Sequence, residues 1–179
     1  MEESILLGIQ EHLRSPYLDP VMIFITHLGD SGWFWVVLTG IFLVFLGTRK
    51  MGATSALALV LSLLINNICL KNLIARIRPY DRIEGLVRLV GEQVDFSFPS
   101  GHSATSFAAA FVIFLNLPKR YGIPALVLAG LIAFSRLYVG VHYPTDVLFG
   151  MLSGIFCAVL AQFLVGRFWG RKKDGNQRV

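Results

Sequence analysis

The sequence predicts an all-α protein, a polytopic membrane helix bundle, from three observations. Hydrophobic residues make up 55% of the 179 residues and charged residues only 15%, whereas about 25% of the residues of a typical soluble domain are charged. The charged residues are clustered, and long stretches between the clusters carry no charge. Several of these stretches approach the ~20 residues that a helix needs to cross a bilayer. A net charge of +5 also suits nucleic-acid binding, but here the basic residues lie at the ends of apolar stretches, so we expect no nucleic-acid partner.

The N-terminal segment, residues 2–14, predicts an amphipathic helix that lies in the membrane interface. Ile5, Leu6, Ile9 and Leu13 fall on one helical face, with polar residues elsewhere. An apolar run over residues 18–28 follows. It is too short to cross a bilayer alone, so we expect it to join the N-terminal helix or to pack as a short span in the bundle.

Five stronger apolar spans follow this short run, and with it they predict a six-helix core. Their approximate bounds are 33–48, 51–70, 103–118, 121–140 and 147–165. A polar stretch, residues 76–100, separates the second span from the third. We expect one transmembrane domain over residues 1–170 and a polar cytoplasmic tail over residues 171–179.

Basic clusters indicate the orientation of the bundle. If the five spans alternate in direction, three clusters fall on one side of the membrane, which the positive-inside tendency assigns to the cytoplasm. These clusters are Arg49-Lys50, Lys119-Arg120, and Arg167 with Arg171, Lys172 and Lys173. Six basic residues fall on the opposite side, where nearby acidic residues roughly balance them; the remaining excess suggests an anionic ligand. The sequence therefore predicts a multi-pass plasma-membrane protein whose active site faces the extracytoplasmic side.

The first of three polar motifs runs from Lys71 to Pro79. Lys71 and Arg78 are seven residues apart, so they would share one face of a helix that Pro79 ends. The pair could bind an anion, or its members could simply be cations that extend their side chains to the membrane interface.

The second motif is Pro99-Ser100-Gly101-His102, directly before an apolar span. Ser100 suits the cap of a helix whose first backbone N–H groups, with the helix dipole, would attract a phosphate. Gly101 would allow the phosphate a close approach. An ordinary capped helix with an interfacial histidine is the alternative reading.

The third motif contains Ser135, Arg136, His142 and Asp146. His142 and Asp146 are four residues apart, so the carboxylate could bind one imidazole nitrogen and leave the other free to attack an electrophile. Helix capping is the alternative explanation of the pair. Because the spans alternate, however, all three motifs fall on one membrane face, and this coincidence favours a phosphoryl-transfer site.

The three motifs resemble those of the type 2 phosphatidic acid phosphatase family, which is related to acid phosphatases and vanadium haloperoxidases. That family's pattern is K-x6-R-P, then P-S-G-H, then S-R-x5-H-x3-D, and every defined position is matched in order. The resemblance implies a metal-independent, two-step reaction that needs no cofactor. His142 would attack phosphorus, Asp146 would orient it, His102 would act as general acid and base, and Lys71, Arg78, Ser100, Gly101 and Arg136 would bind the phosphoryl oxygens.

Membrane embedding favours a lipid phosphate as substrate. We expect undecaprenyl diphosphate first, with phosphatidic acid or phosphatidylglycerophosphate as alternatives. One rival reading is a metal-dependent hydrolase with His102, His142 and Asp146 as ligands, although the nearby cations would repel a metal. Others are a vanadate-using oxidant and, from another class, a lipid-transport or non-catalytic protein on the same fold. The oligomeric state stays open.

Overall fold

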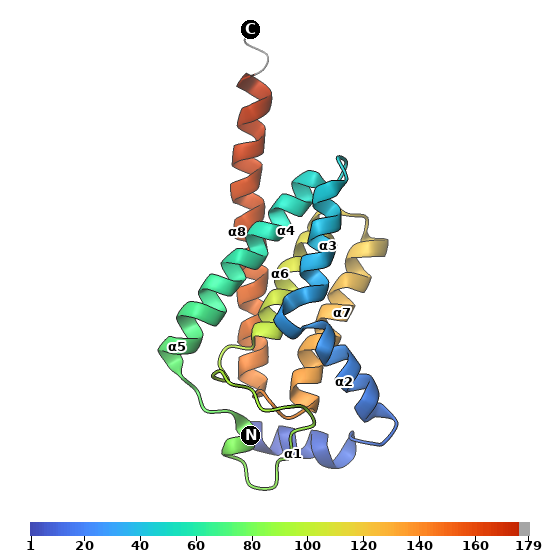
Figure 1. The fold of residues 1–179 in the computed structure, drawn as a ribbon, viewed down its shortest axis with the longest axis vertical. Helices are drawn as coiled ribbons and strands as arrows, with labels where there is room; N and C mark the ends of the chain where they lie inside the picture. Colours follow the sequence, from blue (N-terminus) through green and yellow to red (C-terminus); the bar gives the residue numbers. More distant parts are fainter. Residues whose placement is uncertain (176–179) are drawn as a thin grey trace.

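The computed structural model describes the backbone of residues 1–175 and the side chains of residues 1–169. The predicted tail, residues 171–179, lies outside the described side chains, and residues 176–179 lie outside the described residues altogether. The described chain is an all-α bundle, as predicted (Figure 1). Its elements are α1 (Glu2–His12), α2 (Leu18–Leu28), the 3-10 turn η1 (Asp30–Gly32), α3 (Trp33–Val44), α4 (Arg49–Ser62), the π-helix η2 (Leu63–Leu70), α5 (Lys71–Ile74), the 3-10 turn η3 (Pro79–Asp81), α6 (Gly101–Asn116), α7 (Lys119–Tyr138) and α8 (Pro144–Gly175).

Helix α6 forms the centre of the bundle, packed against α4, α7 and α8. Its buried face is rich in small residues, among them Ala104, Ala108 and Ala110. On α8 the facing position is Gly154, where a Cβ atom would lie 2.3 Å from the backbone oxygen of Ala104. Small residues on both helices thus let the two backbones meet, which is the usual way in which membrane helices pack closely. This contact places the start of α6 beside the start of α8.

The outer faces of the bundle expose large apolar side chains, as expected of helices that contact lipid. Val36, Val60, Val127, Phe156 and Phe163 are each at least half exposed. The predicted N-terminal helix is present as α1, which lies across one end of the bundle (Figure 1). Its apolar face packs partly on protein.

Within α1, Leu6 and Ile9 are buried, whereas Ile5 is exposed, as is Leu13 just after the helix. Leu6 belongs to a cluster with Ile83, Leu86 and Tyr143. The helix is therefore anchored to the loop after η3 and to the turn before α8.

Three segments of the described chain are long and apolar enough to cross a membrane, namely Arg49–Asp81, Lys119–Tyr138 and Pro144–Trp169. A fourth crossing is possible if α2 and the segment Asp30–Val44, bent by 47° relative to each other, act as one. The prediction of five stronger apolar spans is thus confirmed only in part. Helix α3 has 12 residues and α6 has 16, both short for an independent span.

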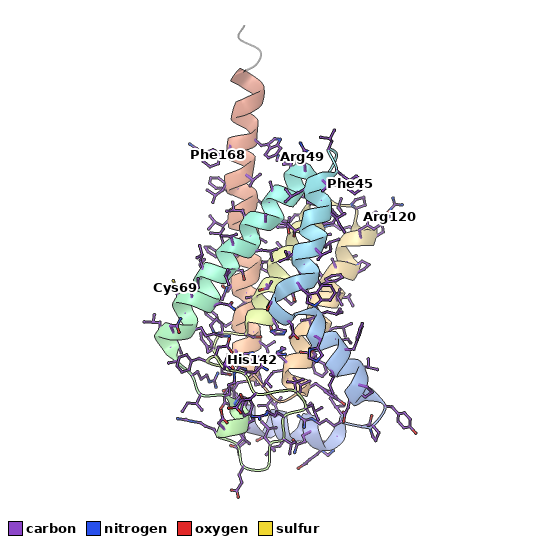
Figure 2. All side chains as sticks on the ribbon, viewed as in Figure 1. Phe45, Arg49, Cys69, Arg120, His142 and Phe168 are labelled. Carbon is purple, nitrogen blue, oxygen red and sulfur yellow. The ribbon has the colours of Figure 1, made fainter. Side chains whose placement is uncertain are left out.

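The two ends of the bundle differ in chemistry. Arg49, Arg120 and Phe168 lie toward one end, and His142 lies near the opposite end (Figure 2). Two of the predicted basic clusters therefore share an end, as the alternation of spans required. The polar motifs gather at the other end, where the loop over residues 82–100 and α1 cover the bundle (Figure 1).

Candidate active site

A pocket of about 610 Å³ opens at the end of the bundle that carries the polar motifs. Five of the eight predicted site residues line it, from four different parts of the chain: Lys71, Arg78, Gly101, His102 and Arg136. The other three, Ser100, His142 and Asp146, are buried next to this lining, each at most 1% exposed. The structure thus brings all eight residues together, although they span residues 71–146.

His142 and Asp146 lie side by side beneath the pocket. His142 Nδ1 is 3.5 Å from Asp146 Oδ2, which is long for a hydrogen bond, as is common in unliganded catalytic sites. Ser97 joins the two groups: its hydroxyl donates to Asp146 Oδ2 at 2.5 Å and lies 3.5 Å from His142 Nδ1. On the opposite side of the ring, His142 Nε2 is 3.5 Å from Arg78 Nη1.

The surroundings of His142 favour a neutral imidazole. Burial lowers the pKa of His142 well below its ordinary value, and the positive charges of Arg78, Arg136 and Lys71 lower it further. A neutral ring retains a lone pair on one nitrogen, which a nucleophile needs. With Nδ1 on the side of Asp146, Nε2 is the nitrogen that faces the cations.

The prediction that Lys71 and Arg78 share one helical face is wrong. Helix α5 ends at Ile74, and Ala75 takes a left-handed conformation with φ 49°. The chain therefore leaves the helix four residues after Lys71, and Arg78 approaches the pocket from extended backbone, with ψ 153°.

The two cations meet at Asp95, which the sequence reasoning did not single out. Lys71 Nζ forms an ion pair with Asp95 Oδ2, and Arg78 Nη2 donates to Asp95 Oδ1 at 2.5 Å. Burial alone would raise the pKa of Asp95, but Lys71 and Arg78 outweigh it and lower the pKa to about 2. Asp95 therefore presents an ionised carboxylate to the two cations.

His102 also has a carboxylate partner that the motifs did not reveal. His102 Nε2 lies 2.9 Å from Asp30 Oδ1, and the other oxygen, Oδ2, lies 2.6 Å from His27 Nδ1. Asp30 sits in the turn η1 between α2 and α3, where Ser31 and Gly32 take positive φ values of 50° and 66°. The signal in the sequence was the polar break Gly29-Asp30-Ser31-Gly32 between two apolar runs.

Ser100 caps helix α6 instead of lining the pocket. Its hydroxyl accepts from Ser103 Oγ at 3.0 Å, and from the Ser103 N–H at 3.5 Å. Its backbone N–H donates to the backbone oxygen of Asp146 at 3.1 Å. Ser100 therefore fixes the start of α6 relative to the start of α8.

Gly101 faces Asn67 across the pocket lining. A Cβ atom at Gly101 would lie 2.9 Å from Asn67 Nδ2, and Asn67 Oδ1 is buried without a hydrogen-bond partner. Asn67 belongs to the π-helix η2; such wide turns are frequent at functional sites.

Comparison with known proteins gives one family and several relatives. Residues 52–169 match the model of the PAP2 superfamily. The chain is 32% identical, over 144 residues, to a protein of Sulfolobus acidocaldarius named undecaprenyl-diphosphatase, and the match covers 80% of this chain and 69% of that protein.

Two crystal structures have the same fold. Aquifex aeolicus LpxE matches with a TM-score of 0.79 and 29% identity, covering 88% of this chain and 92% of LpxE. The first transmembrane PAP2 type phosphatidylglycerolphosphate phosphatase from Bacillus subtilis matches with a TM-score of 0.76 and 33% identity, covering 93% of this chain and 85% of that one.

Proposed function

Because the chain belongs to the PAP2 superfamily and is a membrane lipid phosphatase, we propose that it hydrolyses undecaprenyl diphosphate through a phosphohistidine intermediate and without a metal. The observation that carries the mechanism is the position of His142 Nε2, 3.5 Å from Arg78 Nη1, beside a pocket lined by three cations and His102. The nucleophile, the acid and the charges that a phosphoryl group requires are thus in one place.

In the first step the lone pair of His142 Nε2 attacks the terminal phosphorus. The bond from phosphorus to the leaving oxygen breaks, and His102 donates a proton to that oxygen. Asp146 stabilises the positive charge that develops on the His142 ring. Asp30 keeps His102 oriented for this transfer, because its carboxylate contacts His102 Nε2.

In the second step His102, now neutral, takes a proton from a water molecule as that water attacks the phosphohistidine. The P–N bond breaks, inorganic phosphate leaves, and the electron pair returns to His142. The charge on the equatorial oxygens of phosphorus is stabilised by Lys71, Arg78 and Arg136 and by the backbone at Gly101. Ser100 fixes the start of α6, to which Gly101 belongs.

The cation set also supports the absence of a metal from the reaction. Lys71, Arg78 and Arg136 repel a divalent ion and supply the charge stabilisation that such an ion would otherwise give. We therefore expect phosphate release to continue in the presence of a chelator. Loss of activity on chelation, restored by added zinc, would overturn this part of the proposal.

The proposed topology is a six-helix core in which the short elements α3 and α6 complete the bundle within one domain, residues 1–170. The end with Arg49 and Arg120 faces the cytoplasm and the pocket faces the extracytoplasmic side. A lipid phosphate there can place its head group in the pocket while its tails remain in hydrocarbon.

Undecaprenyl diphosphate is favoured by the relative of that name, and phosphatidylglycerophosphate is the second candidate, because a structural relative is named for it. The test is phosphate release by the purified protein in detergent from undecaprenyl diphosphate, phosphatidic acid, lysophosphatidic acid and phosphatidylglycerophosphate. We expect the highest kcat/KM with undecaprenyl diphosphate. A non-catalytic or transport role would show as no release from any of the four lipids.

A further inference from the structure

Asp146, the partner of the proposed nucleophile, contacts a cation that lies outside the pocket, Arg76. Arg76 Nη1 donates to Asp146 Oδ1 at 2.5 Å. The other oxygen, Oδ2, accepts from Ser97 Oγ at 2.5 Å and from the Tyr143 N–H at 3.0 Å. The side chain of Asp146 is fully buried, so the orientation of its carboxylate depends on these three donors.

Arg76 is itself held by several groups from separate segments. Its Nη1 also donates to Thr145 Oγ1 at 2.8 Å, and its guanidinium lies 3.8 Å from the centre of the Tyr143 ring. Its backbone oxygen accepts from the Ser97 N–H at 2.8 Å. The side chain is 28% exposed, so it stays partly open to solvent.

The second terminal nitrogen of Arg76 contacts Glu2, at the start of α1. Glu2 Oε2 accepts from Arg76 Nη2 at 2.7 Å. Glu2 Oε1 accepts from the backbone N–H of Thr145 at 3.1 Å and from its hydroxyl at 2.7 Å. Burial would raise the pKa of Glu2, but the hydrogen bonds from Thr145 and Arg76 outweigh it and keep that pKa below its ordinary value. Glu2 is thus ionised near neutral pH.

We propose that Arg76 is a positioning residue for Asp146, and that α1 supplies Glu2 to hold Arg76 in place. The proposal rests on the proposed function, since it assigns a step of the same reaction. Asp146 must keep one orientation while the charge on His142 changes, and a carboxylate fixed by a paired guanidinium does so better than one that is free to rotate. The helix α1 thereby contributes to turnover although it does not line the pocket.

The test uses the full chain with its affinity tag at the C-terminus, in detergent, and whichever lipid of the panel the wild-type protein hydrolyses fastest. The key variant is Glu2→Gln, and Glu3→Gln is its matched control, because Glu3 is the exposed next residue of the same helix. We expect Glu2→Gln to lower kcat roughly 10-fold, as small misplacements of catalytic groups do. KM and inhibition by vanadate should stay within about twofold of wild type, because the pocket cations are unchanged.

Substitution of Arg76 gives the second measurement. Arg76→Gln should lower kcat by on the order of 100-fold. Arg76→Lys should have a higher kcat than Arg76→Gln, because lysine keeps the positive charge. Its kcat should stay below that of wild type, because a lysine cannot contact Glu2 and Asp146 at once. A merely structural role predicts instead a lower melting temperature without a selective loss of kcat.

Four outcomes would separate the possibilities. Equal kcat for wild type, Glu2→Gln and Glu3→Gln would overturn the role of α1, and wild-type kcat in Arg76→Gln would overturn the role of Arg76. A loss of kcat matched by raised KM and weaker vanadate inhibition would also count against positioning. Failure of the wild-type protein to release phosphate from any lipid would instead contradict the proposed function itself.

Discussion

Asp30 and His102 meet across the break between α2 and α3, with Asp30 Oδ1 2.9 Å from His102 Nε2. The proposed acid–base residue His102 and the proposed nucleophile His142 therefore have the same arrangement, in which a histidine is paired with a carboxylate. In each case a second donor occupies the other oxygen of the carboxylate: His27 for Asp30, and Arg76 for Asp146. A carboxylate fixed at both oxygens keeps its histidine in one orientation.

Asp30→Asn should lower kcat roughly 10- to 100-fold with little change in KM, because the amide contacts His102 without its charge and misaligns the proton transfer. Initial rates over a range of lipid concentrations measure both constants. Asp81→Asn is the matched control, since Asp81 is exposed. An Asp30 variant with the kcat of wild type would remove Asp30 from the mechanism.

His142→Ala should abolish turnover, whereas His102→Ala should slow it by on the order of 10²–10⁴, the usual contribution of a general acid and base. The difference follows from their roles, because a missing nucleophile cannot be replaced whereas a missing proton donor can be replaced slowly by water. Phosphate release by the two purified variants decides the matter. Near-normal release by His142→Ala would refute the nucleophile assignment.

Asp95→Asn should strengthen inhibition by vanadate, which resembles the five-coordinate phosphorus of the transition state. Asp95 is ionised between Lys71 and Arg78, so an incoming anion must displace it, and the uncharged amide competes less. We expect the half-inhibitory concentration to fall about tenfold, which corresponds to about 1.4 kcal/mol.

The vanadate titration is compared with that of Glu84→Gln, an exposed acidic residue of the same loop. Vanadate should inhibit this control variant at the same concentration as wild type, because losing a loop charge remote from the cations changes the binding of the anion little. Unchanged or weaker inhibition of the Asp95 variant would show that the carboxylate does not compete with the anion.

The stability of the protein should fall as the pH drops below about 6.5, the ordinary pKa of histidine. The pKa of His142 is lowered in the folded state by burial and nearby cations. Below pH 6.5 the unfolded chain therefore binds a proton that folded His142 does not, which favours unfolding by up to about 1.4 kcal/mol per pH unit. Above that pH the contribution is constant.

Thermal melts in detergent between pH 5 and pH 7.5 test this dependence. His142→Gln should show a smaller loss of melting temperature in acid than wild type does, and the exposed residue control His12→Gln should match wild type. Identical slopes for all three proteins would mean that His142 takes up its proton without unfolding.

The all-α class and the gathering of the motifs at one end could be predicted, because apolar spans alternate in direction and motifs at alternate span ends must share a side. The length of α3 could not, since the apolar run expected over 33–48 continues beyond the end of the helix at Val44. Phe45, for example, is apolar but extended, with ψ 124°. Its backbone conformation depends on the following turn and not on its hydrophobicity.

Two of the acidic residues in the site also escaped prediction, for a common reason. Asp30 and Asp95 lie in non-helical segments whose path is set by tertiary contacts, so no periodicity relates them to the motifs. Lys71 and Arg78 were related by a helical spacing that the structure does not keep. Their separation suits one face of a helix, but the left-handed Ala75 ends that helix before Arg78. Helical spacing is informative only while the helix lasts.

The π-helix η2, Leu63–Leu70, determines the direction in which the next residue, Lys71, points. A wide turn takes up one more residue than an α-turn, and each residue of an α-helix rotates the next by roughly 100°. If the same eight residues formed an α-helix instead, Lys71 would be turned by roughly 100° relative to α4 and away from Asp95, with every motif intact in sequence. A chain can thus carry the complete signature of this site and still be unable to assemble it, depending on the type of helix that precedes Lys71.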